Sequence, residues 1–215
     1  TEKHTKEMQR SLKQLERQAE HAQTAFKAAL VGGITVGAVS TLLEIGDNYK
    51  SMAERVKMAT NSVVEYEYAQ KRLLTSANTS FRSLAEAQEL FIATSDNLRG
   101  GYGYTLEQAL DVTDSLSYAF VRNATAADKA KTAINVYDRA LATGKLNAQD
   151  WQSINSAVPT LAKNIGDAMG KSAQEINKMG MSGQLATSMM NEGLLKAKQE
   201  NEDAANSMFN SIADA

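Results

Sequence analysis

Residues 144–176, GKLNAQDWQSINSAVPTLAKNIGDAMGKSAQEI, contain the only tryptophan and the only proline of this 215-residue chain. They also contain several signals for helix ends. Gly144 and Gly170 are suited to the left-handed position that ends a helix, and Asn147 and Ser172 are suited to the cap that begins one. The stretch therefore predicts several short helices joined by tight corners.

The proline and the tryptophan fit such corners better than they fit a catalytic site. Pro159 is expected in the first turn of a helix, where its missing N–H costs nothing. Trp151 supplies a large anchor where helix ends meet. Apolar residues at helical spacing complete the three helices, namely Ile134, Tyr137 and Leu141 before Gly144, Trp151 and Ile154 after Asn147, and Leu161, Ile165 and Met169 after Pro159.

The same signals extend over residues 80–185. Three segments place Ser or Thr three residues before Glu or Gln, the pattern of a reciprocal capping box: SLAE (83–86), TLEQ (105–108) and SAQE (172–175). Glycines that can stop helices alternate with them, at positions 100, 101, 103, 144, 170, 180 and 183. We therefore expect an all-α fold, in which a long N-terminal helix precedes a bundle of short capped helices of roughly 8 to 18 residues.

Composition supports an all-α fold and excludes several kinds of function. A single proline and an excess of helix-forming residues suit helices. With 23 basic and 25 acidic side chains, the chain has no net field to attract nucleic acid, so no specific nucleic-acid partner is expected. The absence of cysteine removes disulfides, thiolate catalysis and zinc–thiolate sites.

The N-terminal arm has a heptad pattern. Its apolar positions alternate in steps of four and three through Met8, Leu12, Leu15, Ala19, Ala22, Phe26 and Ala29. Three heptads are the lower limit for a coiled coil, so a helix that packs on its own domain is an equal alternative. The two interpretations differ only in the partner.

Residues 28–43, AALVGGITVGAVSTLL, carry no charge. Sixteen helical residues span about 24 Å, which is short of the roughly 30 Å hydrocarbon core of a bilayer. Gly33 and Gly37 belong to a small-residue face through which helices can approach closely. We interpret the stretch as a buried helix or inter-chain seam, with a conditional membrane segment as the alternative. The expected self-association residues are Met8, Leu12, Leu15, Phe26, Gly33 and Gly37.

No motif in the chain indicates catalysis. The two histidines, His4 and His21, are too far apart to share a metal within one helix. The glycine-rich RGGYGY (99–104) lacks the spacing of a phosphate-binding loop, and Thr105 simply caps the helix that follows it. We expect no enzyme activity, no catalytic or metal-binding residue and no cofactor.

These patterns divide the chain into three parts. Residues 1–44 form a heptad arm that includes the uncharged stretch 28–43. Residues 45–195 form a helical bundle, which opens with an amphipathic helix through Tyr49, Met52 and Val56 that continues or restarts up to about Leu74. Residues 196–215 form a polar helical extension. We expect the chain to be a piece of a longer protein.

The stretch RALATGKLNAQDWQSINSAVPTLAKNIGDAMGKSAQEINKMGMSGQL (139–185) resembles the N-terminal tape measure domain of tail tape measure proteins from tailed phages and prophages. Similar capped helices precede it, and the likeness covers roughly residues 45–195. A departure is RNATAAD (122–128), where the family commonly has a small-residue turn. Five residues form the structural signature: Gly144, Trp151, Pro159, Gly170 and Gly183.

The resemblance implies a structural and assembly protein inside the phage tail tube, which sets tail length and leaves the tube when DNA is delivered. Its implied partners are other copies of itself, with three favoured over two, the tail tube protein and tail assembly chaperones. Its implied location is the virion, after assembly in the host cytoplasm. The alternative is a membrane-active component that forms a DNA-delivery channel in the host inner membrane. Because a ruler is long unbroken helix, we expect residues 80–185 to be a docking module instead.

Overall fold

A computed structural model describes residues 51–80 and 84–213. The expected heptad arm, the uncharged stretch 28–43 and the cap at Ser83 lie outside these residues. Within the described ranges the chain is helical, and the only β-type pairing there is an isolated bridge between Lys145 and Ala186. The all-α prediction is confirmed.

The described chain begins with residues 51–58, which are helical, and turns through residues 59–62 into α3 (Val63–Ser80). The predicted amphipathic helix therefore restarts rather than continues. The restart is capped locally, because the Glu65 backbone N–H donates to Ser62 Oγ at 3.1 Å and the Asn61 N–H donates to Glu65 Oε2 at 2.8 Å.

Three further elements follow α3: α4 (Leu84–Asp96), the π-helix η1 (Asn97–Gly101) and α5 (Leu106–Arg122). The wide turn of η1 is defined by the Tyr102 N–H, which donates to the Asn97 carbonyl at 3.1 Å. Sequence patterns do not predict a π-helix here, because the glycines of this segment fit helix stop signals. α3 packs against both α4 and α5.

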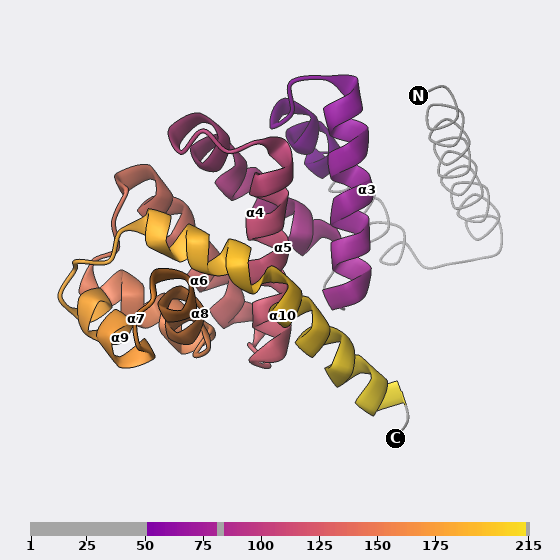
Figure 1. The fold of residues 1–215 in the computed structure, drawn as a ribbon. Helices are drawn as coiled ribbons and strands as arrows, with labels where there is room; N and C mark the ends of the chain where they lie inside the picture. The colour runs from indigo at the N-terminus through magenta and orange to yellow at the C-terminus, as the bar shows by residue number, and fades with distance from the viewer. Residues whose placement is uncertain (1–50, 81–83, 214–215) are drawn as a thin grey trace, which may run out of the picture. The chain divides into compact units, whose positions relative to one another are not determined.

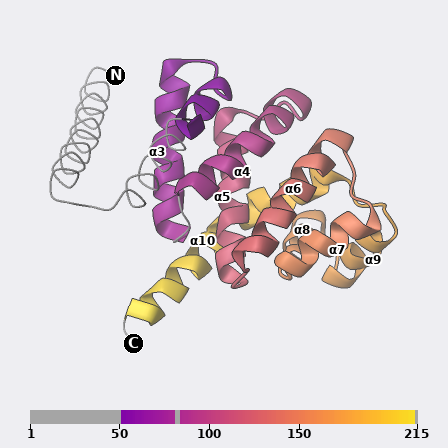
Figure 2. The same ribbon diagram turned by 180° about the vertical axis from the view of Figure 1, so that it is seen from behind.

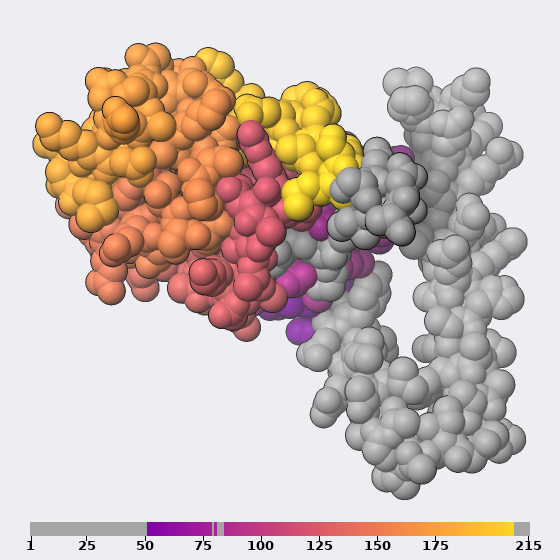
Figure 3. All heavy atoms as spheres, turned by 90° about the horizontal axis from the view of Figure 1, so that it is seen from below, coloured from indigo at the N-terminus to yellow at the C-terminus, as the bar shows by residue number. Residues whose placement is uncertain are grey.

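The second half of the bundle comprises α6 (Ala127–Thr143), α7 (Ala148–Ala157), α8 (Leu161–Met169), α9 (Ala173–Met181) and α10 (Thr187–Ala213). The long α10 returns across the bundle and packs along α5 and α8 (Figure 1). Viewed from behind, α6 lies in front of part of α10 (Figure 2). Helices α7–α9 gather in one lobe at the end away from α3 (Figures 1 and 3).

Two apolar clusters form the core of the described residues. The larger contains Phe120, Tyr137 and Trp151 and draws on helices α4–α10, whereas the smaller contains Leu73 and Phe91 and lies between α3, α4 and α5. Adjacent residues of α4 point into different clusters, since Leu90 belongs to the larger and Phe91 to the smaller. Each buried side chain of this size stabilises the fold by about 1.5–3 kcal/mol.

Most predicted helix ends are confirmed. Complete capping boxes occur at Thr105 with Gln108 and at Ser172 with Glu175. Asn147 caps α7 by accepting from the Asp150 N–H at 2.8 Å. The departure at RNATAAD is a turn in which Ala124 adopts a positive φ of 48°, a conformation that L-residues other than glycine rarely take.

Two predictions about helix ends, at Pro159 and at Gly180, were wrong. Pro159 does not lie in the first turn of α8, because Thr160 is the N-cap and the helix begins at Leu161. It occupies the second position of a turn in which the Leu161 N–H donates to the Val158 carbonyl at 3.0 Å, a position that favours the fixed φ of proline. Gly180 does not stop α9, since the helix runs through it to Met181.

Candidate assembly module

Helices α7–α9 form a lobe whose first and last residues lie side by side. It leaves α6 at Gly144 and returns to α10 at Thr187. Three hydrogen bonds tie these two points together: Thr187 N–H to the Gly144 carbonyl at 3.1 Å, Leu146 N–H to the Leu185 carbonyl at 3.1 Å, and Thr187 Oγ1 to the Ala140 carbonyl at 3.0 Å. The lobe is thereby fixed at its base to α6.

Trp151 is the centre of the lobe, and only 1% of it is exposed. Gly180 of α9 lies directly against its indole ring. A Cβ at Gly180 would come within 2.3–2.5 Å of three ring atoms, which no real contact allows. This close approach, rather than a helix stop, explains the glycine.

A second close approach fixes the lobe to α10. A Cβ at Gly193 would lie 2.7 Å from Ile165 Cγ1 and 2.8 Å from Ile165 Cα, so the backbones of α8 and α10 pack directly on each other. Small residues permit such short separations between helices. The lobe is therefore held at its base by hydrogen bonds and along α8 by backbone packing.

The other signature residues lie at the helix ends of this lobe. Gly144 and Gly170 have φ of 77° and 67° and cap α6 and α8, and Gly183 has φ of 69° in the turn after α9. These values lie in the left-handed region that glycine adopts without strain. The expected self-association residues, from Met8 to Gly37, lie outside the described residues.

A partly buried charged cluster joins α3, α5 and α10, and sequence patterns did not predict it. Arg72 Nε lies 2.9 Å from Asp114 Oδ2, and the same guanidinium contacts Asp111. Lys198 Nζ lies 3.1 Å from Asp111 Oδ1. The spacing of Asp111 and Asp114 on one face of α5 was the available signal, but their basic partners come from distant helices.

Burial raises the pKa of Asp114 from 3.8 to about 6, although the attraction of Arg72 and a hydrogen bond from Ser76 oppose the shift. Only 2% of Asp114 is exposed, and its Oδ2 accepts no aligned hydrogen bond within the described part of the chain. For Arg72, burial alone would lower the pKa, but Asp114 and Asp111 outweigh it and raise the pKa. An enclosed carboxylate of this kind has no access to substrate, so we assign it to the fold.

The raised pKa of Asp114 predicts how stability depends on pH. Because the folded value exceeds the unfolded one, the contribution of this group is fully present below pH 3.8 and is lost as the pH rises through about 6. The difference corresponds to roughly 2–3 kcal/mol. We expect Asp114→Asn to remove this part of the pH dependence, while Arg72 keeps Asp111 as its partner.

Denaturant unfolding of both proteins between pH 4 and 7.5 measures the effect. The free energy of unfolding of the parent, minus that of Asp114→Asn, should fall as the pH rises. Parallel curves would show that Asp114 is not the titrating group.

Polar contacts with α5 also hold the C-terminal half of α10. Asn201, which is fully buried, donates through Nδ2 to Ser115 Oγ at 3.2 Å. Arg122 donates to Asn201 Oδ1 at 3.0 Å and to Glu200 Oε1 at 2.7 Å. These contacts fix the register of α10 along α5.

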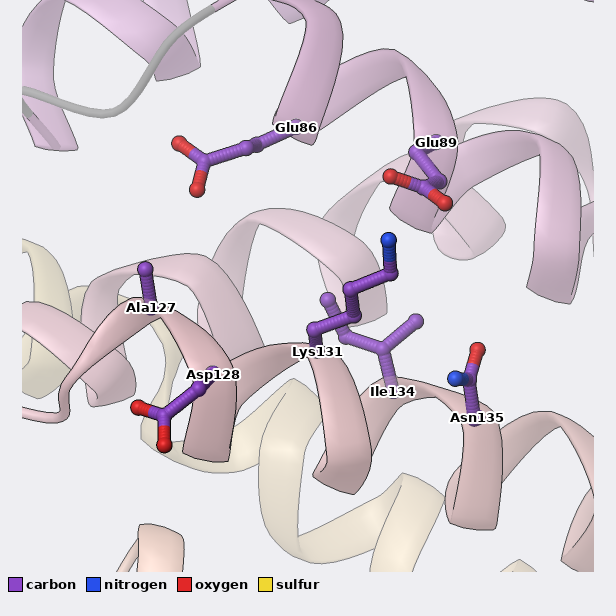
Figure 4. Close-up of a pocket in the computed structure, with 7 residues that line it drawn as sticks. All are labelled: Glu86, Glu89, Ala127, Asp128, Lys131, Ile134 and Asn135. Atoms are coloured by element: carbon purple, nitrogen blue, oxygen red, sulfur yellow. The ribbon is translucent and has the colours of Figure 1, made fainter.

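A groove of about 280 Å³ lies between α4 and α6 (Figure 4). Glu86 and Glu89 project from α4 toward α6, and Lys131 projects back from α6 toward Glu89. The remaining walls are Ala127, Asp128, Ile134 and Asn135. The lining contains no hydroxyl or imidazole nucleophile, so we assign no reaction to this groove.

Two further features are absent from residues 51–80 and 84–213. No group of three or more acidic or histidine side chains there is placed to hold a metal ion. No helix in the same ranges is long and apolar enough to cross a membrane.

Comparison with protein families decides what this module belongs to. The family model for tape measure proteins matches residues 40–215, which is most of the chain. The chain belongs to the tape measure protein family. No curated protein and no solved structure matches it. The resemblance carried by the signature residues is thus confirmed at the level of the family, and a structural role in the phage tail follows for this tape measure protein.

Proposed function

We propose that this tape measure protein lies inside the tail tube, takes part in determining tail length, and leaves the tube when DNA is delivered. Family membership carries the structural role in the tail. The chemistry of the described residues agrees with such a role, because the buried side chains of Asp114 and Asn201 join helices to one another.

Within that function, the described bundle is a docking module and not the ruler itself. The observation that supports this assignment is the folding back of its helices. From α4 to α9 the α-helices contain between 9 and 17 residues, and corners join them. A ruler needs length proportional to residue number, at about 1.5 Å per residue of continuous helix. A compact bundle loses that proportionality, so the measuring part lies elsewhere in the protein.

Protease protection tests the proposed location. In intact virions the chain should resist an added protease that digests the purified chain. After ejection is triggered, mass spectrometry should find the chain missing from the emptied tails. Digestion in intact virions, or retention in emptied tails, would contradict the proposal.

We also propose that the arm associates with other copies of the chain through Met8, Leu12, Leu15 and Phe26. The small-residue face at Gly33 and Gly37 continues this seam. Three copies are favoured over two. During assembly in the host cytoplasm, the tail tube protein and tail assembly chaperones are the proposed further partners.

Removing residues 1–30 should convert the oligomer into a monomer and leave the bundle folded, because the bundle has its own apolar core. Light scattering on the two proteins gives their masses, and circular dichroism checks that the truncated one stays helical. An unchanged mass would assign the arm to its own chain.

The alternative function is a membrane-active component, and the uncharged sequence of residues 28–43 favours it. The stretch is short for a bilayer, but local thinning and the long side chain of Lys27 could accommodate it. Leakage of liposomes after mild denaturation of the protein, lost on replacing Gly33 and Gly37 with Leu, would support this function. Intact liposomes under both conditions would leave the structural role alone.

A further inference from the structure

The turn between residues 51–58 and α3 carries an exposed apolar surface, which we call the entry patch. It consists of Met58, Val63, Val64 and Tyr68, whose exposed fractions are 77%, 63%, 64% and 40%. Among residues 51–78, 80 and 84–208, the only other exposed large apolar side chains are Met181 and Met208, far along the sequence. The concentration at 58–68 is therefore a local feature of this corner.

Neither burial nor helix propensity explains the two valines. Both lie in the first turn of α3, where they stay exposed to solvent. A β-branched residue is a poorer helix former than alanine or the long polar residues that usually cover an exposed helix. Exposed apolar side chains that cluster in this way are typical of a surface that contacts another molecule.

The patch stands on a rigid base. Arg99, from the π-helix η1, donates to the Ala59 carbonyl at 2.9 Å and forms a two-pronged ion pair with Glu65 at 2.9 and 3.0 Å. Glu65 in turn accepts from the Asn61 N–H. The turn that presents Met58, Val63 and Val64 is thus ordered before any partner arrives, which lowers the entropy lost on binding.

The surface beside Met58 is hollowed. A depression of about 460 Å³ borders it, with Ala59, Asn61, Asp96, Arg99, Gly100 and Tyr104 as its other walls. The patch therefore combines projecting apolar side chains with an adjacent depression. Such a surface can receive a side chain from a facing copy.

We propose that the entry patch contacts the entry patch of a second copy of this chain, around the symmetry axis of the oligomer. This inference rests on the proposed self-association of the arm. Around such an axis the same side chains of each copy meet, so Val64 of one copy lies close to Val64 of its neighbour.

The size of the patch explains why a tether is needed. A stable interface between free proteins contributes about 20–30 residues from each side, far more than this patch offers. Copies joined through the arm meet at a much higher effective concentration, at which a small apolar contact forms. The proposed seam ends at Leu43. Because residues 51–58 are helical and rise only about 1.5 Å per residue, the span from Leu43 to Met58 is at most about 40 Å. Patches of joined copies are therefore within reach of one another.

The absence of cysteine from the chain permits a direct test by cross-linking. A Val64→Cys variant of the full chain is oxidised at low micromolar concentration, and Gln174→Cys on the exposed surface of α9 is the matched control. We expect Val64→Cys to form disulfide-linked dimers at least tenfold faster than the control. Adding Val63→Asp to Val64→Cys should suppress the linkage by placing a carboxylate in the patch, while Gln152→Asp on α7 should not.

Light scattering on the same proteins separates this inference from the proposed self-association. An oligomeric mass with cross-linking no faster than that of Gln174→Cys overturns the contact between patches and leaves self-association standing. If Val64→Cys in that oligomer also resists alkylation, another segment or partner covers the patch, and the contact is again overturned. A monomeric mass overturns both proposals.

Discussion

Replacing Trp151 with alanine should lower the free energy of unfolding by about 3–5 kcal/mol, the range for deleting a fully buried large aromatic side chain. Only 1% of the indole is exposed, and it belongs to the larger apolar cluster. Helices α7 and α9 pack across it, so the loss should affect the whole lobe rather than one helix.

Denaturant unfolding followed by circular dichroism measures this loss. Gln152→Ala is the matched control, because the neighbouring side chain is exposed on the same helix and should change stability by less than about 0.5 kcal/mol. A loss below about 1 kcal/mol for Trp151→Ala would contradict the role of the ring as an anchor.

Gly180→Ala should destabilise the fold by about 1–3 kcal/mol or more, although alanine is the better helix former. The added methyl would lie 2.3–2.5 Å from the Trp151 ring, so either α9 or the ring must move. Gly100→Ala is the control, since a Cβ there meets nothing within 4 Å. That substitution should be neutral or stabilising by up to about 1 kcal/mol.

The double variant Trp151→Ala with Gly180→Ala isolates the cause. Once the ring is absent, the methyl occupies the space it vacates, and the second substitution should cost less than about 0.5 kcal/mol. If Gly180→Ala lowers the free energy of unfolding as much without the ring as with it, the steric clash of the added methyl is not with Trp151.

Local signals made much of the fold predictable. The capping boxes at Thr105 and Ser172 and the glycine at Gly144 act within a few residues of themselves, so the sequence around each position is enough to define it. The same holds for the all-α class, which follows from composition and helical spacing. The family resemblance relied on these local features as well.

Features that depend on distant partners could not be predicted in this way. A glycine within a helical pattern fits either a stop or a close approach, and only the position of Trp151 decides between them for Gly180. Asp114 becomes enclosed because Arg72 and Lys198 arrive from other helices. The exposure of Val63 and Val64 is likewise a tertiary property, since their sequence spacing fits a buried helix start equally well.

Cryo-electron microscopy of purified tails tests most directly whether this tape measure protein contains a folded docking module within the tail. We expect density for the folded bundle of residues 51–213 inside the tube and confined to one position along its length. Extended helical density for these residues running along the tube, or a bundle on the outside of the tube, would contradict it.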